Sequence, residues 1–178
     1  MIDKRPTLKE NISITLSDIS ASIDANNAKV ALPLLKWTLS KIQLSYTEFV
    51  RINRKSKPRF VERGSIYYAQ LGTNIGSEQN GHRPVLVVQS EEGNACNNTV
   101  LVIPLTDFLN KKGIPKKILG THVVLQKVDY PDLKKTSIVK TEHIKNISKN
   151  RLLSKICALN SKSIDDVNVK MLISLGIK

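Results

Sequence analysis

The chain has 178 residues, of which 40% are hydrophobic and 24% are charged, so it can build a packed core and does not have the composition of a disordered protein. Lys and Arg outnumber Asp and Glu by 28 to 15, which gives a net charge of +13. This balance makes a polyanion the first partner to consider, although basic chains often bind nothing specific.

Cysteine and histidine usage indicates neither a metal site nor a disulfide framework. Cys96 and Cys157 form no Cys-x-x-Cys pattern, and the three histidines lie singly at His82, His122 and His143. We therefore expect no metal ligands and no cofactor. The first residues are charged and lack a signal-type apolar core, and no segment approaches membrane-spanning length. A cytoplasmic protein without membrane contact is predicted.

Two amphipathic patterns open the chain. Residues 7–23 carry an apolar stripe at helical spacing, and a second stripe follows at 31–49. Pro33 is acceptable if the second helix starts near Leu32, so we predict a helical hairpin. Such a hairpin could pack on the rest of the protein, pair with a second copy or hold a partner. The stripe residues are Leu8, Ile12, Leu16, Ile19 and Ile23, then Ala31, Leu35, Leu39, Ile42, Tyr46 and Phe49.

A basic run at 51–59 follows the hairpin and contains Pro58, which is typical of a linker. We place a domain boundary here, with an N-terminal helical extension at 1–60 and a second domain at 61–178. Both parts are basic, with 11 basic and 5 acidic residues in the first and 17 and 10 in the second. Solvation of the linker is the simpler interpretation of its charge, and contact with phosphate is the alternative.

The second domain begins with a strand at 66–71, a loop of twelve residues at 72–83 and an aliphatic strand at 84–89. The loop is rich in Gly and Asn, which tolerate left-handed backbone geometry. It can therefore fold tightly and bring its polar side chains together at the mouth of a sheet.

Further short strands and one terminal helix complete the pattern. We expect a polar turn at 90–98, a strand at 99–106, a basic loop at 111–117, strands at 121–126 and 137–142, and a helix capped by Asn160 or Ser161 and ending before Gly176. Pro104 suggests an edge or a bulge in its strand. Several short strands with one helix favour an α+β protein built on a small antiparallel barrel.

The segments Arg63-Gly64 and GSEQNGHRP, residues 76–84, carry a resemblance to a known family. They resemble the MazF/PemK toxins of type II toxin–antitoxin systems, and the likeness extends over about 61–178. The resemblance implies an SH3-like antiparallel barrel of the CcdB/MazF/PemK type. It also implies a homodimeric, metal-independent endoribonuclease that cleaves single-stranded RNA or mRNA at a short sequence and inhibits growth. Its partner would be an acidic, MazE-like antitoxin, through which any DNA contact would be made.

Cleaving RNA without a metal requires a base, an acid and hydrogen-bond donors around the reacting phosphate. Arg83 and Thr106 align with the residues that carry catalysis in the family, so the resemblance assigns them that role. From the residues alone, Arg83 could equally form an ion pair with Glu78, and Thr106 could satisfy a backbone group at a strand end. Ser77 and Gln79 suit recognition of bases or phosphate.

The group that moves the proton stays open, because a guanidinium is a poor base. Glu78 and His82 are both candidates, and His82 could instead act only as a hydrogen-bonding residue in RNA binding. Asp107 stands where the family commonly has a small hydroxyl residue, and its charge is expected to weaken substrate binding.

Two other functions fit parts of this pattern. A CcdB-like gyrase poison would share the barrel, but the intact GSEQNGHRP block disfavours it. A non-catalytic RNA-binding module would have the same basic surface, but the presence of both Arg83 and Thr106 favours an enzyme.

Overall fold

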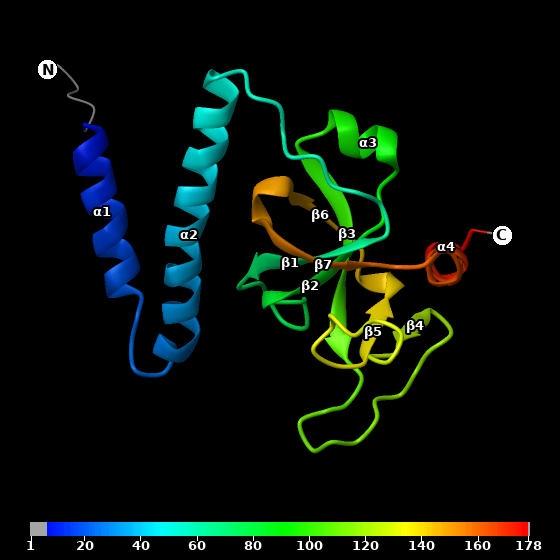
Figure 1. Ribbon diagram of the computed structural model, residues 1–178. Helices are drawn as coiled ribbons and strands as arrows, with labels where there is room; N and C mark the ends of the chain where they lie inside the picture. Colours follow the sequence, from blue (N-terminus) through cyan, green and yellow to red (C-terminus); the bar gives the residue numbers. More distant parts are fainter. Residues whose placement is uncertain (1–6, 178) are drawn as a thin grey trace, which may run out of the picture. The chain divides into compact units, whose positions relative to one another are not determined.

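The computed structural model describes residues 7–177, and their contacts divide the chain into two compact units. The first unit ends at Ile42 and the second begins at Gln43. Figure 1 shows a helical hairpin at the N-terminal end and a curved antiparallel sheet with further helices in the remainder. Among the helices of residues 7–177, none combines the length and apolarity needed to cross a membrane.

The hairpin consists of α1 (Leu8–Ala21) and the first part of α2 (Ala28–Asn53). Thr7 caps α1 with a capping box: its hydroxyl accepts from the backbone of Glu10, and the Glu10 carboxylate accepts from the Thr7 N–H at 2.6 Å. Between the helices, the Asp24 carboxylate accepts from the backbone N–H groups of Asn26 and Asn27, at 2.8 and 2.9 Å. This local turn confirms the predicted hairpin.

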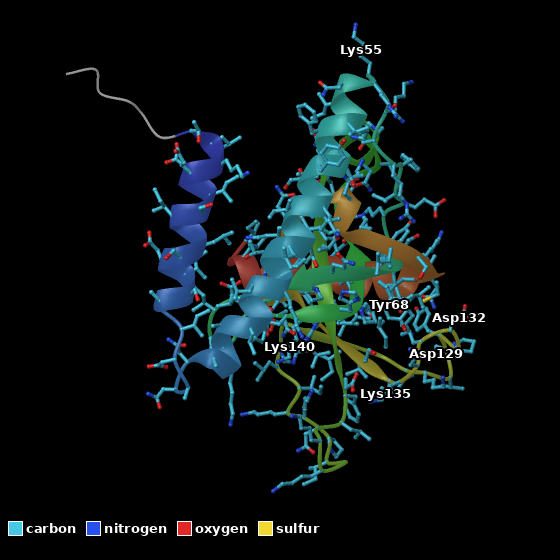
Figure 2. All side chains as sticks on the ribbon, turned by 90° about the vertical axis from the view of Figure 1, so that its left-hand side faces the viewer. Lys55, Tyr68, Asp129, Asp132, Lys135 and Lys140 are labelled. Carbon is cyan, nitrogen blue, oxygen red and sulfur yellow. The ribbon has the colours of Figure 1, made fainter. Side chains whose placement is uncertain are left out.

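The expected start of the second helix was wrong by one turn. α2 begins at Ala28 and includes Pro33 in its interior. A proline at this depth forgoes one backbone hydrogen bond, which the long helix tolerates. At the other end Lys55 adopts a left-handed φ of 53° and the Ser56 N–H donates to the Arg51 carbonyl at 3.1 Å, which stops the helix (Figure 2).

The sheet has seven strands in the order β4-β5-β3-β2-β1-β7, with β6 paired to β3. Every pairing between these strands is antiparallel. The strands are β1 (Ser65–Gly72), β2 (Gly81–Val87), β3 (Thr99–Asp107), β4 (His122–Leu125), β5 (Ser137–Lys140), β6 (Lys145–Ser148) and β7 (Leu152–Ala158). The antiparallel α+β architecture expected from the sequence is therefore present.

The central strands bury side chains on both faces. On β2, Val85 and Val87 enter one apolar cluster, while Leu86 enters the other. On β3, Val102 and Ile103 divide in the same way. This alternation explains why the sequence shows solid aliphatic runs here instead of an apolar and polar alternation.

Helix α4 (Ser161–Leu175) covers one of these faces, and its Val167 is buried in the same cluster as Leu86. Asn160 caps the helix, accepting from the Ser163 N–H at 2.9 Å, and Gly176 ends it in a left-handed conformation with φ 69°. Both predicted ends of this helix are confirmed.

Several sequence predictions needed correction in this unit. The segment expected to be a polar turn contains a short helix, α3 (Glu91–Cys96), because the Ser90 hydroxyl caps it. β2 starts at Gly81, so the loop before it is shorter than the predicted twelve residues: pairing with β1 extends through His82 and Arg83. β6 and β7 were not predicted at all.

From the sequence we expected Pro104 to lie either at a sheet edge or in a bulge. The first alternative was wrong, because Pro104 does not lie on an edge strand. β3 is central and pairs with β2 on one side, and on the other side with β6 at 99–102 and with β5 at 105–107. Pro104 lies between these last two segments, at the point where β3 changes partner. A residue without an N–H donor is tolerated there, since neither β6 nor β5 pairs with it.

Gly64 provides a test of packing between the sheet and α4. Its φ is +76°, and a Cβ at this position would lie 2.6 Å from Cδ1 of Ile164. Gly113 has a similar φ of +77° but open space around it. We expect Gly64→Ala to lower the free energy of unfolding by about 2 kcal/mol and Gly113→Ala by about 1 kcal/mol, because only the first adds a clash to the backbone strain.

Urea unfolding followed by far-ultraviolet circular dichroism measures this difference. Equal losses for the two variants would show that the contact with Ile164 relaxes without cost.

Candidate active site at the ends of strands β2 and β3

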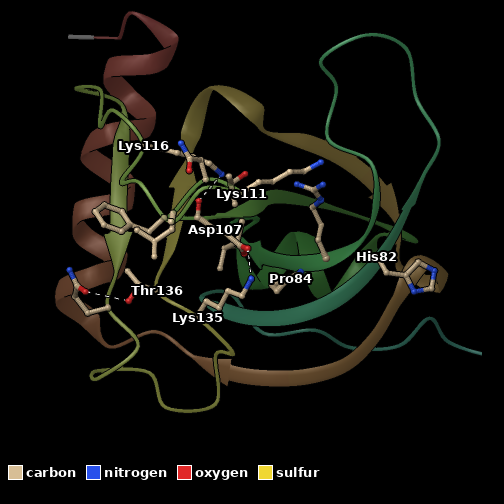
Figure 3. A pocket seen from close by; sticks show the side chains of 15 residues that line it. His82, Pro84, Asp107, Lys111, Lys116, Lys135 and Thr136 are labelled. Carbon is tan, nitrogen blue, oxygen red and sulfur yellow. Dashed lines mark hydrogen bonds and ion pairs between the residues drawn. The ribbon is translucent and has the colours of Figure 1, made fainter.

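A pocket of about 1200 Å³ opens where β2 begins and β3 ends (Figure 3). Its wall combines those two strand ends, the loop that follows β3 and the residues that precede β5. The lining residues are His82, Arg83, Pro84, Leu105, Thr106, Asp107, Phe108, Leu109, Asn110, Lys111, Gly113, Lys116, Gln126, Lys135 and Thr136. Segments that are distant in sequence therefore meet in one concave surface.

The pairing of β2 with β3 brings Arg83 and Thr106 together. Val85 lies opposite Pro104 in this ladder. Side chains alternate between faces with a period of two, so the same register continued along that face places Arg83 opposite Thr106. Both line the pocket.

Arg83 is held by two hydrogen bonds to the loop that precedes it. Its Nε donates to the carbonyl of Asn80 at 2.8 Å, and its Nη1 donates to Oε1 of Gln79. Partial burial lowers the pKa of Arg83, and the nearby Asp107 carboxylate opposes that change. A guanidinium remains protonated under these conditions, so the site holds a fixed cation with further donors for a ligand.

The hydroxyl of Thr106 is buried and has no hydrogen-bond partner among the described residues. The alternative that it satisfies a backbone group at the strand end is therefore not realised. An unpaired buried hydroxyl costs about 1–3 kcal/mol, and such groups call for an explanation. A donor or acceptor on a bound ligand would supply the missing bond.

The loop residues predicted for the site separate into two groups. Gln79 contacts Arg83, and His82 lines the pocket, although Figure 3 shows it apart from Asp107 and Lys135. Ser77 and Glu78 are exposed and do not line the pocket. The Glu78 carboxylate accepts from Nζ of Lys145 at 3.2 Å, so the predicted alternative of an ion pair with Arg83 is not formed.

Asp107 is neutralised by a neighbour. Its carboxylate accepts from Nζ of Lys135 at 2.9 Å, and its carbonyl accepts from Nζ of Lys116 at 2.8 Å (Figure 3). With Arg83 and Lys111 also in the lining, the pocket wall holds four cationic side chains and one carboxylate. The site therefore stays electropositive, and the repulsion of a polyanion expected from Asp107 is largely offset.

Sequence reasoning identified the basic loop at 111–117 but missed Lys135. The Lys134-Lys135 pair just before a predicted strand was the available signal. Its meeting with Asp107 depends on the pairing of β5 with β3, which joins Ser137 to Asp107.

The other two histidines lie outside this pocket. His122 is buried, accepts from the Leu119 N–H at 3.1 Å and contacts Oε1 of Glu142 at 2.8 Å. Burial lowers the pKa of His143. No group of three or more His, Cys, Asp or Glu residues within 7–177 is arranged to hold a metal ion.

The sequence matches the family described as PemK-like, MazF-like toxin of type II toxin-antitoxin system over residues 62–175. Among similar proteins is the Endoribonuclease MazF of Staphylococcus saprophyticus, 40% identical over 117 residues, which covers 66% of this chain and 92% of that protein. The Endoribonuclease MazF of Staphylococcus epidermidis is 38% identical over the same length.

Solved structures share the fold at low identity. MazF from Deinococcus radiodurans superposes with a TM-score of 0.55 at 19% identity, covering 67% of this chain and 99% of that one. A mycobacterial endoribonuclease in complex with its cognate antitoxin gives a TM-score of 0.53 at 21% identity, covering 66% and 97%. These matches establish the SH3-like, CcdB/MazF/PemK-type barrel.

Glu142, which lies outside the pocket lining, makes the stability of the fold depend on pH. Burial would raise the pKa of its carboxyl, but hydrogen bonds from its own backbone N–H, His122 and Thr121 outweigh burial and lower the pKa. A depressed folded pKa adds stability above the unfolded pKa of about 4.3, and this stability is lost as pH falls through the folded value. We expect Glu142→Gln to be less stable at neutral pH by roughly 1 kcal/mol or less, since the carboxylate is partly screened.

Urea midpoints measured from pH 7 down to acid should show this difference shrinking. A difference that stays constant with pH would mean that the variant acts through packing and not through charge.

Proposed function

Because the chain belongs to the MazF/PemK family of type II toxins, we propose that it is an endoribonuclease toxin that cleaves single-stranded RNA at a short sequence and thereby inhibits translation and growth. The observation that carries this proposal is the convergence of Arg83 and the unpaired Thr106 hydroxyl in a basic pocket. Such a surface suits a reacting phosphate better than a neutral ligand.

We assign the toxin domain to 61–178 and treat 1–60 as an extension. The family match begins at residue 62, and Val61 is fully buried in the sheet core. Arg59, just before this limit, already contacts the domain: its guanidinium donates to the Leu153 carbonyl at 2.7 Å and lies 5.0 Å from the Tyr67 ring.

The proposed reaction is a transesterification within RNA. The ribose 2′-oxygen attacks the adjacent phosphorus and loses its proton to a base, while the 5′-oxygen leaves and takes up a proton from an acid. The products are a cyclic phosphate and a free 5′-hydroxyl. Arg83 donates to the non-bridging oxygens as their charge grows, and Thr106 provides a second hydrogen bond to the same phosphate.

His82 is the better placed of the two candidates for proton transfer. It lines the pocket, whereas Glu78 is paired with Lys145 and lies outside the lining. An imidazole ring carries two nitrogens, one of which can donate a hydrogen bond while the other accepts one, and this suits both halves of a proton exchange.

RNA recognition is assigned to the loop and the surrounding lysines. Ser77 and Glu78 have exposed polar groups for the edges of unstacked bases. Gln79 holds Arg83 in place, so its contribution to binding is indirect. Lys111 and Lys116 line the pocket, and their charges suit contact with the RNA backbone.

The partners follow from the family. We infer a homodimer that is blocked by an acidic, MazE-like antitoxin. Any DNA contact is made by the antitoxin, and the location is cytoplasmic, where mRNA is accessible. The mycobacterial relative in complex with its cognate antitoxin supports the partner. A gyrase poison or a binding-only module gains nothing from these comparisons, since the curated relatives are named endoribonucleases.

Arg83→Ala and Thr106→Ala should each lower the rate of RNA cleavage by about two to three orders of magnitude, the usual effect of losing one preorganised donor. Thr99→Ala is the matched control, since Thr99 lies at the opposite, exposed end of β3. Cleavage of a labelled RNA by purified protein, with melting curves alongside, measures the effect. Near-parental cleavage by a folded Arg83→Ala or Thr106→Ala protein would refute the site.

Cleavage should persist in excess EDTA. The nucleophile in this mechanism is the RNA's own 2′-hydroxyl, and the described residues contain no arrangement of three metal-binding side chains. Loss of activity on chelation, restored by added Mg²⁺, would contradict the mechanism.

A further inference from the structure

Helix α2 carries apolar residues at six successive a and d positions of a heptad repeat. They are Leu32, Leu35, Leu39, Ile42, Tyr46 and Phe49, separated alternately by three and four residues. We call this set the α2 seam. A strict repeat of this kind is typical of helices that pair side by side, and it spans roughly 26 Å along the axis.

Five of the six side chains of the α2 seam are exposed in the single chain, and Leu35 is half-buried. Leu39 is 65% exposed, Ile42 60%, Tyr46 66% and Phe49 61%. The rings of Tyr46 and Phe49 stack on each other, with their centroids 6.5 Å apart, and so form one continuous apolar surface. Contiguous apolar surface on this scale normally marks a contact with another molecule.

Helix α1 does not close the hairpin. Its own apolar residues Leu8, Ile12 and Leu16 are 78%, 52% and 60% exposed. No residue of α1 or α2 is buried. The two helices therefore leave most of their apolar side chains available to a partner.

The charges around the α2 seam fit a second copy of the same helix. The flanking e positions are Lys36, Gln43 and Val50, and the g positions are Ala31, Thr38, Ser45 and Ile52. With one charge among seven, two identical helices meet no like-charge repulsion at these positions, which is what decides partner choice in coiled coils.

The net charge of the hairpin also favours a second copy of this chain as the partner. Residues 7–49 contain four lysines (Lys9, Lys29, Lys36 and Lys41) and four acidic residues (Glu10, Asp18, Asp24 and Glu48), so the hairpin is neutral. The basic excess of the extension lies outside it, mainly in 51–59. An acidic protein partner would be drawn to the basic pocket and not to this surface.

We propose that α2 pairs along its seam with α2 of a second copy of this chain. The contact lies entirely outside residues 62–175, the part that matches the toxin family. It is therefore a self-association separate from any contact between the barrels, and it holds whether or not the barrel cleaves RNA.

The test uses the full chain with Ile42→Glu, which places a carboxylate in the seam, and Val30→Glu as the matched control. Val30 lies on the same helix at an f position and is 63% exposed, against 60% for Ile42. Sedimentation of each protein over a wide range of concentration gives the dissociation constant for self-association. We expect Ile42→Glu to raise it by about tenfold or more and Val30→Glu to leave it unchanged.

A second measurement places the contact. With Cys96 and Cys157 replaced by serine, Ile42→Cys should cross-link into dimers with a short bismaleimide, and Val30→Cys should not. Circular dichroism checks that both variants keep their helices. An unchanged dissociation constant in Ile42→Glu, equal weakening in both glutamate variants, or equal cross-linking at both cysteines would each overturn the proposal.

Discussion

The register between β2 and β3 is the constraint on which the rest of the structure depends. Both faces of these strands are buried, with Val87 and Val102 in one cluster and Leu86 and Ile103 in the other. A slip of one residue would exchange every side chain between the faces, and neither cluster could accept the change. Core packing thus fixes the register, and the register in turn brings Arg83 to Thr106.

The buried polar groups at the pocket lower the stability of the fold, and the apolar packing of the surrounding sheet offsets this loss. Arg83 is partly buried and keeps its charge, while the Thr106 hydroxyl is buried without a partner in the described chain. Each feature costs free energy in the unliganded protein. Both become favourable when an anion with acceptor oxygens enters, so the same groups that weaken the fold define what it binds.

The sequence predicted the elements whose signals are local. The hairpin, the terminal helix with its Asn160 cap and the strands with long aliphatic runs are all found. β6 was missed because it has only four residues, and β7 because the exposed Lys155 interrupts its apolar pattern. The helix α3 was missed because six residues are too few for a periodic signal.

The candidate site also contains features that the sequence predicted and features that it could not. Arg83 and Thr106 were identified through a family resemblance, since their residue types alone allowed simpler structural roles. The partner of Glu78 is Lys145, which is 67 residues away in sequence and reaches it through the pairing of β6 with β3. Contacts of this kind depend on strand order, which no local pattern encodes.

The last turns of α2 connect the seam to the barrel. Glu48 accepts from Nδ2 of Asn150 at 2.8 Å, and it also pairs with Arg51 at 2.5 Å, which lowers the pKa of its carboxyl. Glu48 lies between Tyr46 and Phe49, so two seam residues stand on a segment that is hydrogen-bonded to the catalytic domain. Pairing of two α2 helices would then constrain this segment in both copies. The proposed self-association would therefore act on a segment that is hydrogen-bonded to Asn150 of the barrel.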